Sequence, residues 1–177
     1  MINNNASVTP LSIATCDLCD RFKSDTSAGV QALPAIWRAY GARAAFAGPV
    51  ATVKCLDDNS LVKSAVESPG LGRVLVVDGA GSMARALLGG NLGAAAAANG
   101  WAGLLIHGCV RDVAELAQCD VGILALASNP MPTHRQGQGL ADVPVHIGGC
   151  WIAPGHWLYA DADGVVVSTG PVHNAKL

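Results

Sequence analysis

Charged and aromatic side chains are scarce in this sequence of 177 residues, of which 14 % are charged and 5 % are aromatic. Hydrophobic residues make up 51 %, and this excess of apolar side chains argues against long disordered tracts. A chain of this length is expected to bury a core as a single domain, which we assign to residues 1–177. Ala, Gly, Val and Leu dominate, and this mixture favours close packing of helices on a sheet.

Several functions and locations are disfavoured by what the sequence lacks. Lysine and arginine do not cluster and the net charge is −2, so we expect no direct binding of nucleic acid. Glycines break up the apolar stretches, so we expect no membrane span. Residues 1–7 are polar and have no basic segment followed by an apolar one, which predicts no signal peptide and a cytoplasmic protein. The cysteines are spread along the chain and are expected to be reduced thiols: Cys16, Cys19, Cys55, Cys109, Cys119 and Cys150.

Helical and extended patterns alternate through the middle of the chain, and extended patterns cluster at its end. Helices are expected over 9–22, 60–66 and 112–117, and an alanine-rich helix is expected to end at Asn99 and Gly100. One or two strands are expected within 41–55, and others at 74–77, 104–106, 122–127, near 145, and at 157–159 and 165–168. A brief helix is expected to end near Leu88, and 129–139 is expected to be a surface loop. This order predicts an α/β fold in the form of a layered α/β sandwich.

A glycine-rich turn, Gly89-Gly90-Asn91-Leu92, opens the alanine-rich helix. The start of a helix carries unpaired N–H groups and a partial positive charge, and glycine lets an anion approach the backbone. No Asp or Glu lies between Gly79 and Arg111, so the surrounding charge favours a carboxylate or phosphate. The alternative is an ordinary tight turn, and the turn by itself does not separate the two interpretations.

Arg111, Asp112 and Glu115 follow an expected strand, at a point where open α/β sheets tend to bind ligands. Arg111 can hold a 2-oxo acid through two hydrogen bonds, and Asp112 with Glu115 can hold a hard divalent cation. The alternative is structural, because Asp-x-x-Glu at a helix start also forms a capping box without any metal.

Three other motifs are interpreted as structural. Gly79 to Ala84 resembles a dinucleotide-binding fingerprint, but no acid follows at the distance needed to bind a ribose. Cys16 and Cys19 have metal-site spacing without a second pair, so they are expected to pack in the core. His134 and Arg135 are expected to lie on a solvated loop.

The combination of motifs resembles one family over about residues 16–168. The segments that carry the resemblance agree in order and spacing: 74–82, Gly89-Gly-Asn-Leu92, Gly108-Cys-Val-Arg-Asp112 and 158–164. The family contains the regulator of ribonuclease E activity A and the class II 4-hydroxy-4-methyl-2-oxoglutarate aldolases. The resemblance implies a swivelling-domain-like α/β sandwich that assembles as a ring-shaped homotrimer, with sites between subunits.

The resemblance also implies roles for site residues. In the aldolases, backbone amides of the turn matching Gly89, Gly90, Asn91 and Leu92 hold the carboxylate of pyruvate. The arginine matching Arg111 contacts the substrate, and the aspartate matching Asp112 binds Mg²⁺ or Mn²⁺. Some members have an aspartate where this chain has Gly90, whereas others have glycine there and an acid at the position of Glu115. The chain follows the second pattern.

We therefore expect a lyase that cleaves 4-hydroxy-4-methyl-2-oxoglutarate to two pyruvates and decarboxylates oxaloacetate as a side activity. Arg111 and Asp112 are the expected catalytic residues, and Asp112 and Glu115 the expected metal ligands. The alternative is a regulator that binds and inhibits ribonuclease E without catalysis of its own. An older interpretation of the family as quinone-biosynthesis methyltransferases has no support in the sequence, which lacks a convincing cofactor fingerprint.

Overall fold

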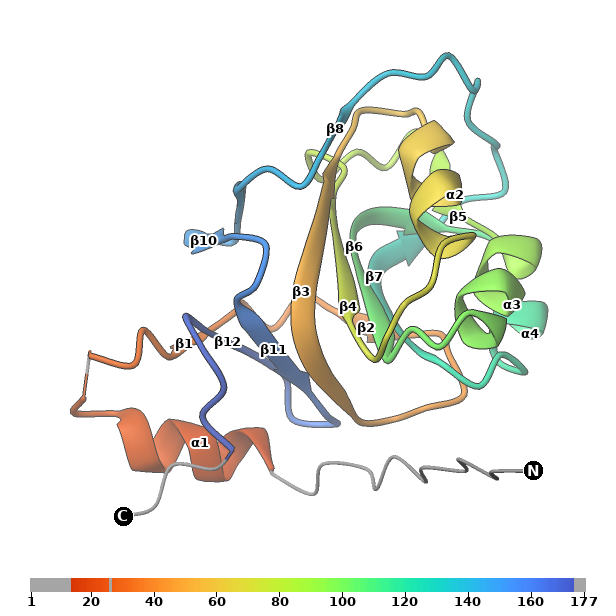
Figure 1. Cartoon of the computed structure of the whole chain (residues 1–177). Coiled ribbons are helices and arrows are strands. Elements are labelled where there is room, and N and C mark those ends of the chain that lie inside the picture. Colours follow the sequence, from red (N-terminus) through yellow and green to blue (C-terminus); the bar gives the residue numbers. More distant parts are fainter. Residues whose placement is uncertain (1–13, 26, 174–177) are drawn as a thin grey trace, which may run out of the picture.

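Parallel strands form the middle of a ten-stranded sheet (Figure 1). The structure, a computed structural model, describes residues 14–25 and 27–173. The order of its main path is β1 (Gln31–Ala32), β12 (Val165–Ser168), β11 (Trp157–Ala160), β3 (Phe46–Lys54), β4 (Val74–Asp78), β6 (Gly103–Val110), β7 (Gly122–Ser128) and β2 (Arg38–Ala39). β5 (Ala86–Leu88) pairs with β6, and β8 (Leu140–Ala141) pairs with β3. A separate hairpin joins β9 (Val145–Ile147) to β10 (Cys150–Ile152).

The long strand β3 joins the antiparallel and parallel parts of the sheet. Its first half, from Phe46 to Pro49, pairs antiparallel with β11, and its second half pairs parallel with β4. All five residues of β4 are buried, as expected for a strand covered on both faces. β4, β6 and β7 run parallel, so their carboxyl ends meet at one edge of the sheet.

Three helices cover one face of the parallel strands: α2 (Ser60–Val66), α3 (Gly90–Ala98) and α4 (Val113–Leu116) (Figure 1). The core between this face and the helices includes Leu75, Leu104 and Ile106, and a second core on the other face includes Val76 and Leu105. A smaller cluster lies beneath α1 (Thr15–Phe22), where Leu18 packs near Tyr159. The predicted α/β fold is confirmed. No helix in the described ranges combines the length and the apolar character that crossing a membrane requires.

Small residues bring α3 and α4 close together. A Cβ atom at Gly93 would lie 2.6 Å from Leu116 Cδ2 and 3.2 Å from Cys119 Sγ, so the helices approach at a point where only glycine fits. α3 ends at Ala98, and Asn99 and Gly100 follow, the latter with φ +74°, as the sequence predicts. This packing fixes the start of α4 beside the start of α3.

One expectation about secondary structure and one about burial are wrong. The segment that leads to Leu88 is the strand β5 rather than a helix, because Ala86 and Leu88 pair with β6. Cys16 is exposed rather than in the core, because Thr15 and Leu18 form the buried face of α1. The expected start of this helix, over 9–13, lies outside the described residues. All six cysteines are free thiols.

Candidate functional site

The candidate site lies where two strands end and two helices begin. The backbone N–H of Arg111, after β6, donates to the carbonyl oxygen of Leu88 at the end of β5, over 2.9 Å. Gly89 is the residue before α3, and Asp112 is the residue before α4. Residues far apart in sequence are therefore adjacent at the carboxyl edge of the parallel strands, where α/β proteins tend to bind ligands.

Asp112 adopts the left-handed conformation, with φ 56° and ψ 46°, which is uncommon for residues other than glycine. A capping residue normally has extended backbone angles, and the Asp112 side chain makes no capping hydrogen bond to α4. Its Oδ2 atom instead accepts a hydrogen bond from the backbone N–H of Gly90, over 3.1 Å. The capping-box hypothesis for Asp112 and Glu115 is therefore wrong, and the carboxylate of Asp112 points to the start of α3.

Gly89 and Gly90 leave room for three charged side chains. A Cβ atom at Gly89 would lie 2.6 Å from Asp112 Oδ2 and 3.2 Å from Arg111 Nε. A Cβ atom at Gly90 would overlap the Glu115 carboxylate and lie 2.8 Å from Glu115 Cβ. Both carboxylates thus lie against the same short segment, and Glu115 fills the volume that a side chain at Gly90 would need.

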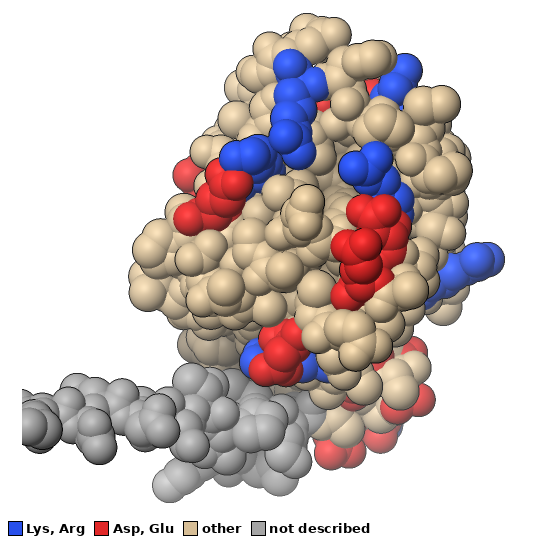
Figure 2. Space-filling view, turned by 90° about the vertical axis from the view of Figure 1, so that its right-hand side faces the viewer, with Lys and Arg blue, Asp and Glu red and all other residues tan. Residues whose placement is uncertain are grey.

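The structure brings all the predicted site residues together. Arg111 Nε lies 3.5 Å from Asp112 Oδ2, and each of these side chains is 39 % exposed, so both remain accessible to a small molecule. In the predicted turn, the N–H of Leu92 is bonded to Gly89 O, whereas the N–H of Asn91 has no acceptor among the described residues. Acidic and basic side chains lie next to one another on the face that carries α2, α3 and α4 (Figure 2).

The carboxylates suit a hard divalent cation. Within residues 14–25 and 27–173, no three His, Cys, Asp or Glu side chains are grouped so that they could hold a metal ion together. Mg²⁺ in proteins commonly takes only one or two carboxylates and keeps several waters, with substrate oxygens completing its shell. Asp112 and Glu115 fit that requirement better than the requirement of a zinc site, which takes three or four protein ligands.

A second polar group, which the sequence analysis missed, lies at the start of α2. Asp58 is 2 % exposed, and its carboxylate accepts hydrogen bonds from the backbone N–H groups of Ser60, Gln136 and Gln138, over 2.7 to 3.1 Å. The next residue, Asn59, accepts from Thr133 Oγ1 and Arg135 Nε.

We call Asp58 and Asn59 the polar anchor, because they fasten the expected loop 129–139 to the fold. His134 and Arg135 are both exposed, as expected for a solvated loop, and Arg135 is in addition tied to the fold through its hydrogen bond to Asn59. Burial opposes ionisation of Asp58, but the hydrogen bonds from Ser60, Gln138 and Gln136 outweigh it, so its pKa lies well below the usual range. The run Asp57-Asp58-Asn59-Ser60 before a helix is a signal for a helix start that the sequence offers.

The loop that the polar anchor holds also borders the candidate site. The backbone N–H of Asn129 donates to Val110 O, and Met131 O accepts from the N–H of Ala86. Arg85 donates through Nη1 to Pro132 O, over 2.7 Å. The loop therefore connects the start of α2 with the strand ends that carry the site.

The fold and the site define an α/β protein that presents a glycine turn and paired carboxylates at the carboxyl ends of parallel strands. The chain belongs to the RraA-like family: the family model described as Aldolase/RraA matches residues 15–167.

Similar proteins carry three different functional names. A protein of Albidiferax ferrireducens, provisionally named a 4-hydroxy-4-methyl-2-oxoglutarate aldolase, is 57 % identical over 171 residues, covering 92 % of this chain and 98 % of its own length. The solved structure of the RNA-processing inhibitor RraA from Thermus thermophilis is 41 % identical, with a TM-score of 0.87 over 93 % of this chain and 97 % of that one. A Geobacillus kaustophilus structure, named an S-adenosylmethionine:2-dimethylmenaquinone methyltransferase, is also 41 % identical, with a TM-score of 0.86 over 93 % of this chain and 100 % of that one.

Proposed function

We propose that this protein is a divalent-metal-dependent class II aldolase. It cleaves 4-hydroxy-4-methyl-2-oxoglutarate to two pyruvates and decarboxylates oxaloacetate as a side activity. The observation that carries the proposal is the convergence of the Asp112 and Glu115 carboxylates on Gly90, with Arg111 lying across Gly89. The aldolase name of the 57 % identical relative supports it.

The glycine turn and Arg111 bind the substrate in this proposal. The free N–H of Asn91 and the positive end of α3 attract the carboxylate of a 2-oxo acid. Arg111 Nε is close enough to Gly89 to contact an acid held at that turn.

Asp112 and Glu115 are the residues that would hold the metal, and both lie beside the turn that would bind the acid. A divalent cation there supplies a positive charge that polarises the 2-oxo group. Aldol cleavage and decarboxylation both break a C–C bond and leave the electron pair on what becomes pyruvate, so one site serves both. Arg111 stabilises the negative charge that develops as the bond breaks.

The proposal includes a ring-shaped homotrimer with the sites between subunits. Apolar side chains are exposed beside the site in the single chain: Met83 is 51 % exposed, Met131 52 % and Val113 42 %. Exposed apolar groups next to a polar site are typical of an interface, and a neighbouring subunit would cover them.

The first test is pyruvate release from each of the two substrates, with Mg²⁺ or Mn²⁺ and with a chelator. Asp112→Ala is expected to lower metal-dependent release at least about 100-fold, because it removes a ligand and the partner of the Gly90 N–H. Asp20→Ala, which removes an exposed carboxylate on α1, is the matched control and should retain wild-type release. Unchanged release by folded Asp112→Ala would overturn the assignment.

The second candidate is a regulator that binds ribonuclease E, favoured by the likeness to the RNA-processing inhibitor RraA. It predicts binding of purified ribonuclease E at micromolar concentration, with wild type and Asp112→Ala binding equally well. Such binding together with no pyruvate release from folded protein would favour the regulator over the aldolase.

A further inference from the structure

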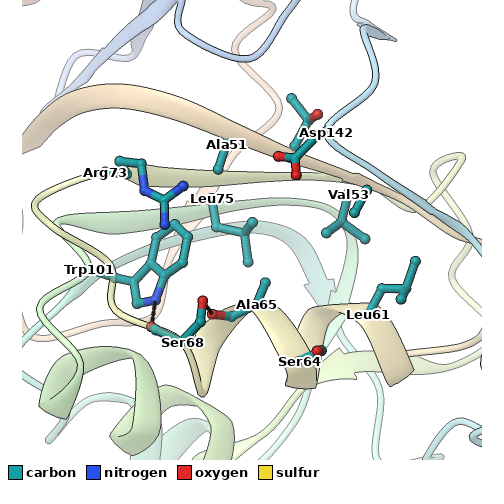
Figure 3. Close-up of a pocket in the computed structure, with 12 residues that line it drawn as sticks. Ala51, Val53, Leu61, Ser64, Ala65, Ser68, Arg73, Leu75, Trp101 and Asp142 are labelled. Carbon is teal, nitrogen blue, oxygen red and sulfur yellow. Dashed lines mark hydrogen bonds between the residues drawn. The ribbon is translucent and has the colours of Figure 1, made fainter.

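A cavity of about 250 Å³ lies between α2 and the strands β3, β4 and β8, away from the candidate site (Figure 3). Trp101, which lines the cavity, lies shortly before β6, whereas Arg111 follows the other end of that strand. The eight residues of β6 span about 25 Å, so the cavity and the candidate site are separate. Its floor is apolar and includes Ala51, Ala65 and Leu75.

Arg73 forms a fixed cationic end of this cavity. Its guanidinium lies over the Trp101 ring, 4.9 Å from the centroid, and donates through Nε to Gly70 O and through Nη2 to Pro69 O. The remaining nitrogen, Nη1, has no acceptor among the described residues. Because the side chain is already held by stacking and two hydrogen bonds, little conformational entropy is lost when Nη1 binds a ligand.

Asp142 forms an acidic end. Its backbone is fixed by the hydrogen bond from its N–H to Thr52 O, and its carboxylate has no partner among the described residues. Figure 3 shows this carboxylate turned toward the strand that carries Ala51 and Val53, while Arg73 lies beyond Leu75 at the other end. An unpaired cation and an unpaired anion thus face an apolar floor from opposite ends.

We infer that this cavity binds a small carboxylate that has an apolar body and an amino or hydroxyl donor at its far end. The carboxylate pairs with Arg73 Nη1, the body covers Ala51, Ala65 and Leu75, and the donor reaches Asp142. A dianion such as the proposed aldolase substrate is disfavoured here, because its second carboxylate would face Asp142. The site is therefore distinct from the candidate site in ligand as well as in position.

The test uses 4-(aminomethyl)benzoate, with benzoate and benzylamine as probes of one end each, in calorimetry and saturation-transfer NMR. We expect 4-(aminomethyl)benzoate to bind with a Kd of about 1 mM or tighter. Arg73→Met should weaken binding of 4-(aminomethyl)benzoate and benzoate about tenfold without affecting benzylamine. Asp142→Asn should weaken 4-(aminomethyl)benzoate and benzylamine but not benzoate; asparagine tolerates the left-handed backbone of Asp142, at φ 54°.

Matched controls separate this pattern from general effects of charge. Arg38→Met and Asp20→Asn remove exposed charges outside the cavity and should leave all three affinities unchanged. Arg73→Lys replaces Arg73→Met if the latter does not fold, and it should still weaken benzoate, because lysine cannot stack its planar group on Trp101 while it bonds to the two carbonyl oxygens.

Three results would overturn the proposal. The first is no binding of any probe at about 10 mM. The second is binding that neither Arg73 nor Asp142 substitutions change. The third is self-association in sedimentation that Asp142→Asn weakens without any probe, since a second copy would then occupy the cavity.

Discussion

Asp58 and Asp112 are both aspartates next to a helix, and they differ in how fully their hydrogen-bonding capacity is used. Asp58 is almost fully buried and accepts three backbone hydrogen bonds, two of them from a distant loop. Asp112 is partly exposed and accepts one, from Gly90. A carboxylate can accept about four hydrogen bonds, so Asp58 is nearly saturated and Asp112 has capacity left.

This difference separates a structural role from a functional one. A saturated buried carboxylate holds segments together and has nothing left for a ligand, whereas an exposed carboxylate with free lone pairs can bind a cation. The comparison predicts that substitutions at Asp58 lower the free energy of unfolding and that substitutions at Asp112 weaken the binding of a cation.

The largest effect on stability is expected from Asp58→Ala. It leaves three backbone N–H groups without their acceptor, which should lower the free energy of unfolding by about 3 kcal/mol. Asp112→Ala removes one hydrogen bond and should cost about 1 kcal/mol or less. Urea unfolding of both variants measures the difference, and equal losses would break the comparison.

Acid should lower the free energy of unfolding of the wild type more than that of a variant that lacks the Asp58 carboxylate. The pKa of Asp58 is lowered in the folded protein, so its contribution is fully present above the unfolded pKa of about 4 and is lost as the pH falls toward the folded pKa. The contribution should decrease by about 1 kcal/mol by pH 3. Unfolding curves between pH 7 and pH 3 should converge for wild type and Asp58→Asn; parallel curves would contradict the assignment.

A loss of metal affinity is expected from Gly90→Ala. The new Cβ displaces the Glu115 carboxylate, and the affinity for Mn²⁺ should fall about tenfold, as measured by electron paramagnetic resonance. The double variant Gly90→Asp with Glu115→Ala supplies a carboxylate from the other side and should recover part of the affinity. Ala94→Ser, on an exposed position of α3, is the control.

The smallest effect is expected from Thr133→Val, which removes the hydrogen bond to Asn59 while nearly keeping the shape. The free energy of unfolding should fall by about 1 kcal/mol. Thr133→Ser keeps the hydroxyl and should restore most of it. A Thr133→Val variant as stable as wild type would show that this hydrogen bond does not help to hold the loop.

Local patterns were sufficient to predict the central strands and the end of α3. The run of β-branched and leucine residues at 74–77 is buried on both faces, and Asn99 and Gly100 end α3. The segment 86–88 was predicted as a helix, because three apolar residues fit either period. The segment forms a strand because it pairs with β6, which is a tertiary contact.

The candidate site was predictable in its residues but not in its orientation. Arg111, Asp112 and Glu115 follow a strand, and this position could be inferred from the sequence. The left-handed backbone of Asp112, which turns its carboxylate toward Gly90, depends on how α3 and α4 pack. The polar anchor was missed because Asp58 bonds to Gln136, 78 residues later, and no local pattern specifies that contact.

The shared volume of Gly90 and Glu115 constrains the order in which an acid could be moved from one of these positions to the other. A side chain gained at Gly90 while Glu115 is present meets an occupied space, and so that intermediate is crowded. Shortening Glu115 first leaves a vacancy at an exposed edge, which water can fill. The favoured route between the two arrangements therefore passes through a form with Asp112 as the lone carboxylate at the turn.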